Sequence, residues 1–154
     1  MAGFMSVLRT KVYNGTYRNG TGNGVANGIL LALEAVDVDG EKVLKLVKPT
    51  AGTGKFLVKE PREVAEFAPY DTERTHGYAI EVQDPGDLYF IENLVFVNES
   101  NEEWDTLTYE APDGALLRAH KLESGEEFVT DEVEGEDLKT GAALKATADG
   151  KLAV

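Results

Sequence analysis

The sequence contains no cysteine, one tryptophan and two methionines among its 154 residues. Without thiols the chain cannot form disulfides, thiolate metal sites or a cysteine nucleophile. A chain of this size needs no such cross-link, because a domain of about 150 residues buries roughly 68–70% of its unfolded surface. The length therefore fits one domain with or without an appendage, and the missing cysteine agrees with synthesis in a reducing cytoplasm.

Long apolar runs are also missing. The longest, Ile29–Leu33 and Leu94–Val97, fall far short of the roughly 20 residues that a membrane-spanning helix requires. Met1–Thr10 lacks the apolar stretch of roughly 7–15 residues that a signal peptide contains. We therefore expect a soluble protein that neither uses the usual secretory route nor binds a membrane.

Acidic residues are absent from the first 33 positions, although the whole chain has a formal net charge of −13. That segment contains Arg9, Lys11 and Arg18 and carries a charge of +3. The other 121 residues contain 12 basic and 28 acidic side chains, which gives them a charge of −16. Because phosphate binding needs clustered Lys and Arg, this acidic body is not expected to bind nucleic acid.

Asn-Gly dipeptides occur four times between Asn14 and Gly28. Asn-Gly favours the positive φ angles of tight turns, and four such pairs leave no room for conventional strands between them. The segment also carries the aromatic residues Phe4, Tyr13 and Tyr17. We therefore predict that residues 1–28 form an extended N-terminal arm that docks onto a neighbour, with a flexible terminus as the alternative.

Residues 29–154 predict a β-rich body. Asp39-Gly40 separates two apolar segments, Ile29–Val38 and Lys42–Lys48, and this arrangement is typical of a β-hairpin. Leu88–Val97 is the most apolar stretch, so we expect it to form the central core.

One segment of the body favours a helix. In Pro61–Phe67, proline occupies a suitable first helical position, and Val64 and Phe67 are three residues apart. Helical periodicity is otherwise absent almost everywhere.

Turn-forming residues recur about every 8–12 residues from Ala115 to Val154, between short segments with strand character. This spacing is typical of a β-sandwich or small barrel. The predicted fold class is therefore all-β, a sandwich or small barrel that allows one short helix and carries the extended arm. Residues 115–154 could form a β-strand subdomain of the body.

Motifs for catalysis are not found. His76 and His120 lack neighbours that would orient a general base, so both are expected on the surface or in loops. Ala51–Phe56 resembles a phosphate-binding loop, but Pro49 and Phe56 stand where that loop needs Gly and a hydroxyl residue. We expect no enzyme, no cofactor and no metal site, although two carboxylates placed as in a glycosidase cannot be recognised from sequence.

Two polar stretches remain open to interpretation. The acidic run Asp131–Asp137 predicts a solvated face, with a loosely held divalent ion as the alternative. Trp104 lies among Asn101, Glu102, Glu103 and Asp105, which makes it a candidate exposed anchor for a sugar or a protein partner. Packing of Trp104 in the core is the expected arrangement, and the exposed anchor is the alternative.

Residues 114–154 resemble a recurring piece of tailed-bacteriophage head proteins encoded beside the major capsid protein. The similar features are the segments Leu117–Leu122 (LRAHKL), Gly125–Thr130 (GEEFVT) and Ala148–Val154 (ADGKLAV), with Gly135, Leu138 and Gly141 between them. These proteins are capsid decoration (cement) proteins, which are small, acidic and β-rich. They bind outside the head lattice, often as trimers, and clamp neighbouring capsomers.

The resemblance implies a non-enzymatic virion protein, made in the host cytoplasm, whose partner is the major capsid protein. We expect the N-terminal arm to make much of the lattice contact, through Arg9, Lys11, Tyr13, Tyr17 and Arg18. Another virion structural protein, such as a tail-tube or head-fibre subunit, is one alternative. A carbohydrate-binding module or an enzyme is the other.

Overall fold

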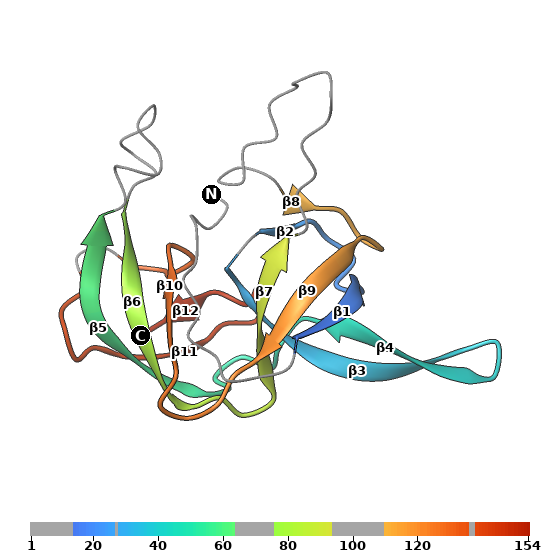
Figure 1. The fold of residues 1–154 in the computed structure, drawn as a ribbon, viewed down its shortest axis with the longest axis horizontal. Coiled ribbons are helices and arrows are strands. Elements are labelled where there is room, and N and C mark those ends of the chain that lie inside the picture. The colour runs from blue at the N-terminus through green and yellow to red at the C-terminus, as the bar shows by residue number, and fades with distance from the viewer. Residues whose placement is uncertain (1–13, 27, 64–75, 94–109, 136–137) are drawn as a thin grey trace, which may run out of the picture.

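The computed structural model describes residues 14–26, 28–63, 76–93, 110–135 and 138–154. This part of the chain contains β-strands and no helix, which confirms the predicted all-β class. The strands form a closed five-stranded barrel, a second sheet of five strands and a pair of two-residue strands (Figure 1).

The barrel has the strand order β1-β4-β3-β7-β9, and β9 closes it by pairing with β1. Neighbouring strands are antiparallel except β1 and β4, which are parallel. The five strands are β1 (Asn14–Asn19), β3 (Leu30–Val38), β4 (Glu41–Val47), β7 (Leu88–Asn93) and β9 (Leu116–Lys121).

The second sheet has the strand order β10-β6-β5-β11-β12 and lies beside the barrel (Figure 1). Its strands are β5 (Lys55–Glu63), β6 (His76–Asp84), β10 (Glu127–Thr130), β11 (Ala143–Ala146) and β12 (Leu152–Ala153). A short pair at the end of the barrel joins β2 (Val25–Ala26) to β8 (Glu110–Ala111). Residues 115–154 do not form a separate subdomain, because β9 belongs to the barrel and β10–β12 to the second sheet.

The first three residues of β3 and the described side chains of β7 supply two hydrophobic cores, one on each face of the sheet. Successive side chains of a strand point to opposite faces. Leu30 and Phe90 accordingly pack in the core shared with the second sheet, whereas Leu31 and Ile91 pack in the barrel core. This double burial explains the apolar run of β7 and confirms the predicted core over its described residues.

Three phenylalanine rings fix the barrel against the second sheet. Phe90 of β7 lies with its ring centroid 5.0 Å from that of Phe128 of β10. Phe128 in turn lies 6.2 Å from Phe56 of β5, at an interplanar angle of 76°. Each ring is at most 1% exposed. Full burial of such a side chain contributes about 1.5–3 kcal/mol, so this contact joins the two sheets firmly.

The predicted hairpin at Asp39-Gly40 is confirmed. The two turn residues have φ angles of 51° and 84°. Positive φ at both central positions is the signature of a type I′ turn, whose twist matches that of the flanking strands. The tip of the β3–β4 hairpin extends away from the rest of the molecule (Figure 1).

The described residues of the predicted arm do not form an arm. Strand β1 pairs with β9 from Asn14↔His120 to Arg18↔Leu116 and with β4 at its other edge, so it closes the barrel. Pairing with β9 outweighs the turn preference of Asn14-Gly15. Deleting residues 2–24 would therefore remove a barrel strand. Residues 1–13 lie outside the described part of the chain.

The predicted helix at Pro61–Phe67 is wrong over its first three residues, which complete β5. Pro61 pairs with Tyr78 just after an irregularity in the β5–β6 ladder. Strand β11 covers the other edge of β5 only at Phe56 and Leu57, so the missing N–H of Pro61 breaks no bond to β11. Residues 64–67 are outside the described ranges.

Candidate functional site

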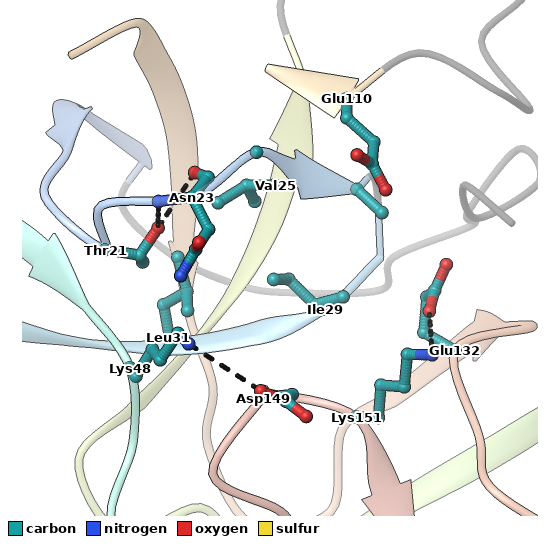
Figure 2. Close-up of a pocket in the computed structure, with 12 residues that line it drawn as sticks. Thr21, Asn23, Val25, Ile29, Leu31, Lys48, Glu110, Glu132, Asp149 and Lys151 are labelled. Carbon is teal, nitrogen blue, oxygen red and sulfur yellow. Dashed lines mark hydrogen bonds and ion pairs between the residues drawn. The ribbon is translucent and has the colours of Figure 1, made fainter. Parts of the chain in front are cut away.

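A hollow of about 370 Å³ opens between the barrel and the second sheet (Figure 2). Charged residues line it from several separate parts of the chain. They follow β4, lie in β8, follow β10 and precede β12, and they are Lys48, Glu110, Glu132, Asp149 and Lys151. These charged side chains surround the buried carboxylate of Glu132.

Asn19 holds in place the loop that forms one wall of this hollow, through Thr21 and Asn23. Its side chain is buried, and its Nδ2 donates to the carbonyl oxygens of Asn23 and Ala111 at 2.8 and 3.2 Å. Its Oδ1 accepts a hydrogen bond from the backbone N–H of Thr21 at 3.0 Å. These bonds fix the loop after β1 against the strand β8. The Asn19-Gly20 pair thus anchors a loop at the end of a strand.

The floor of the hollow is apolar. Val25, Ile29 and Leu31 line it and are 2%, 6% and 1% exposed. The backbone N–H of Leu30 donates to the carbonyl oxygen of Gly150 at 2.8 Å, which holds the turn before β12 against β3. The hollow therefore combines an apolar surface with a charged rim.

Two ion pairs cross the rim (Figure 2). Lys48 Nζ lies 3.7 Å from Asp149 Oδ1, and both side chains are exposed. Such an exposed pair contributes at most about 1 kcal/mol. Lys151 Nζ lies 3.9 Å from Glu132 Oε2, which is beyond direct hydrogen-bonding distance.

Glu132 is the buried charge of the site. It is 4% exposed, and its Oε1 has no hydrogen-bond partner within the described ranges. Burial raises the pKa of its carboxyl above the usual value, whereas the charge of Lys151 acts in the opposite direction. The negative charge of Glu110 raises the pKa further, and the two carboxylates extend into the same hollow (Figure 2).

The prediction of a solvated acidic face over Asp131–Asp137 is therefore wrong at Glu132. The backbone holds this residue in place, because the N–H of Leu152 donates to the Glu132 carbonyl at 3.1 Å. The N–H of Glu134 donates to the Leu152 carbonyl at 2.7 Å. This local pairing turns Glu132 inward, whereas Glu134 stays exposed.

His120 forms a second buried polar contact. It is 6% exposed, contrary to the expected surface position, and its Nε2 lies 2.8 Å from Glu92 Oε1. This contact with His120 lowers the pKa of the Glu92 carboxyl, an effect that outweighs the opposing influence of burial. The backbone of His76 belongs to β6, and its side chain lies outside the described part.

The end of the β3–β4 hairpin presents an uncovered apolar surface. Strand β7 pairs with β3 only at residues 30–32, and β1 pairs with β4 only at Lys45 and Leu46. Residues 33–44, here named the distal ribbon, therefore pair only within the β3–β4 hairpin in the described part of the chain. Within the ribbon, Val38, Val43 and Leu44 are 43%, 39% and 47% exposed.

The apolar side chains of the distal ribbon lie on both faces. Val36 is opposite Val43, and Ala35 is opposite Leu44 in the neighbouring register position. Residues that are directly opposite share a face, and consecutive pairs alternate. The ribbon thus offers apolar side chains on two faces, and its two outer edges pair with no other strand that the structure describes. Sequence reasoning missed this surface, although Val36 and Val38 before the Asp39-Gly40 turn and Val43 after it were a signal for it.

The structure gives two of the predicted contact residues intramolecular roles. Tyr17 is partly buried against the barrel core. Arg18 Nη1 donates to the Gly114 carbonyl oxygen at 2.9 Å, and the residue remains exposed. Capsid contact by either residue stays a prediction. The remaining candidates, Arg9, Lys11, Tyr13 and Trp104, lie outside the described residues.

No protein-family model, no curated protein and no solved structure matches this chain. In the described residues, no cluster of three or more His, Cys, Asp or Glu side chains is placed to hold a metal ion. The same part of the chain has no helix with the length and apolar character needed to cross a membrane. The fold and the site define an all-β protein with an acidic surface, a charged hollow and an apolar ribbon.

Proposed function

We propose that the protein is a structural virion protein that binds the exterior of a phage capsid and stabilises the lattice of the major capsid protein. The observation that carries this proposal is the uncovered distal ribbon. A two-stranded ribbon alone is marginally stable in water, and exposed apolar side chains clustered on it indicate a binding surface.

The ribbon is suited to a flat or grooved partner. A strand of the partner could pair with an outer edge of β3 or β4, since no described strand pairs with either outer edge over residues 33–44. Strand addition of this kind provides backbone hydrogen bonds, and the apolar side chains on either face add buried area. Both contributions strengthen binding to the partner, and neither requires a reaction.

The rest of the molecule supports a clamping role. The barrel and the second sheet share a core that contains the three phenylalanine rings in contact, so force on the ribbon passes to a rigid body. The segment that resembles decoration proteins, residues 114–154, contributes β9 to the barrel and β10–β12 to the second sheet. It therefore belongs to this rigid body.

The charge favours a capsid-bound trimer over a free one. A formal net charge of −13 makes isolated subunits repel one another. Binding to a common lattice would offset that repulsion by adding contacts to the major capsid protein. We accordingly propose that subunits assemble into trimers on the capsid surface and are smaller species in solution.

The decisive experiment mixes the purified protein with expanded, undecorated heads and examines the particles by cosedimentation and electron cryomicroscopy. We expect saturable binding and added density at repeated positions outside the lattice. Absence of added density at saturating protein would exclude the proposal. Rings or fibres formed by the purified protein alone would favour a tail-tube or head-fibre subunit, and binding to a glycan array would favour a carbohydrate-binding module.

A further inference from the structure

The charged hollow has the chemistry of a binding site for a cation with an aliphatic stem. Its floor is formed by Val25, Ile29 and Leu31, and its rim carries the carboxylates of Glu110 and Glu132. An ammonium or guanidinium group needs acceptors, and its alkyl stem needs apolar surface. The hollow supplies both in adjacent positions (Figure 2).

The charges of the lining leave room for one positive charge. Lys48 and Lys151 face three carboxylates, those of Glu110, Glu132 and Asp149, so one negative charge is in excess when all are ionised. A buried carboxylate oxygen without a hydrogen bond is costly, and Glu132 Oε1 is such an oxygen among the described residues. Lys151 approaches only the other oxygen, at 3.9 Å. A donor that enters the hollow would therefore find an unused acceptor.

We propose that this hollow binds one alkylammonium or alkylguanidinium group, with its charged head between Glu132 and Glu110 and its stem over Ile29. Two sources provide this chemistry. One is a lysine or arginine side chain of a bound protein, and the other is a free alkylamine. The proposal goes beyond capsid binding and does not depend on it.

The pH dependence follows from the groups that face the head. Glu132 follows β10, Glu110 belongs to β8, Lys151 and Asp149 precede β12, and Lys48 follows β4. Protonation of Glu132 removes the negative charge nearest the head. Binding should therefore weaken as the pH falls. Because burial raises the pKa of Glu132, this loss should begin at a higher pH than it would with a glutamate of ordinary pKa.

The test is a titration of the full chain with n-butylammonium, followed by two-dimensional amide NMR at neutral pH. We expect saturable shift changes around Ala26, Ile29 and Lys151, with a dissociation constant on the order of millimolar for so small a ligand. Neutral n-butanol, which has the same stem, should bind at least about tenfold more weakly. Equal binding of the two compounds would overturn the proposal.

Two variants separate the site from nonspecific attraction to an acidic protein. Glu132→Gln keeps the shape and should weaken n-butylammonium binding at least about tenfold, a change of about 1.4 kcal/mol. Glu134→Gln, two residues away and exposed, is the matched control and should bind as wild type. Glu110→Gln, at an exposed position, provides a second test that does not alter a buried group. Unchanged affinity in both Glu132→Gln and Glu110→Gln would refute the site.

The source of the cation is decided with undecorated heads. A lower head occupancy of Glu132→Gln than of Glu134→Gln would identify a capsid lysine or arginine as the occupant. Equal occupancy would identify a free alkylamine. If the wild type fails to bind heads at all, the proposed function fails, while the amine titration still decides whether the hollow is a cation site.

Discussion

His120 Nε2 lies 2.8 Å from Glu92 Oε1, and this contact links β9 to β7 diagonally across the barrel wall. The histidine ring is 6% exposed and tilts against the ring of Phe90, with centroids 6.3 Å apart. The Glu92 side chain remains 32% exposed, so the pair joins a buried group to the surface. Arg118 stands directly opposite Glu92, but its Nη1 is 3.9 Å from Glu92 Oε2.

The first prediction concerns this pair. Glu92→Gln should lower the free energy of unfolding by about 1 kcal/mol, because a neutral amide replaces the charged carboxylate that contacts the buried His120. Arg118→Gln is the control and should cost less, since Arg118 is half-exposed and farther from the carboxylate. Urea titration of the two variants measures the difference, and equal losses would contradict the assignment.

The Glu92 contact also predicts a pH dependence. Its folded-state pKa is lowered from the usual value of 4.5, so the folded state holds fewer protons than the unfolded state as the group titrates. The stabilisation is present above about pH 4.5 and is lost as the pH falls through the folded-state pKa. The stability difference between wild type and Glu92→Gln should therefore shrink in acid.

The second prediction tests the distal ribbon. Leu44→Ser should leave the free energy of unfolding within about 0.5 kcal/mol of wild type, because the side chain is 47% exposed. It should lower head occupancy at least about tenfold if the ribbon binds the lattice. Leu116→Ser is the matched control, with a leucine that is 46% exposed on β9. Equal occupancy of the two variants would place the lattice contact elsewhere.

The third prediction concerns the turn that joins the two sheets. Gly150 has a φ of +86°, and a Cβ atom there would meet the carbonyl oxygen of Leu30. Gly150→Ala should therefore destabilise the protein by several kcal/mol. Gly141 has a φ of +89° with open space around it, so Gly141→Ala should cost only the left-handed backbone penalty of about 1–2 kcal/mol. Thermal melting compares them, and equal midpoints would contradict this reading.

The fourth prediction concerns Glu132. Its pKa is raised above the usual value of 4.5, so the folded state holds more protons than the unfolded state and stability falls as the pH rises through this range. Glu132→Gln should be the more stable protein at pH 7, by on the order of 1 kcal/mol. The difference should vanish as the pH approaches 4.5.

Urea titrations of Glu132→Gln between neutral and mildly acidic pH measure this effect. Glu134→Gln, whose side chain is exposed, should track the wild type throughout. A wild type that loses stability relative to Glu132→Gln on acidification would contradict the assigned direction.

Features fixed by short stretches of sequence could be predicted. Asp39-Gly40 defines a two-residue turn through its own backbone preferences, and the observed hairpin follows from it. The spacing of turn residues likewise indicated an all-β fold. The apolar run of β7 identified a core strand, because a strand that is buried on both faces has apolar residues at consecutive positions.

Features that depend on distant residues could not be predicted. Asn14-Gly15 alone favours a turn, and only the ladder to β9 makes it part of a strand. His120 and Glu132 look like surface residues in their local sequence. Their burial follows from packing against β7 and from pairing with β12, neither of which short-range patterns reveal.

The place of β1 between β4 and β9 governs when the nascent chain can fold. The barrel stays open until Lys121 has left the ribosome, because β9 supplies one of the two edges that β1 requires. Folding that waits for contacts between distant segments is slow. Interrupted synthesis before that point should release fragments with an unclosed barrel, which makes translation to the end of β9 a condition for any assembly-competent molecule.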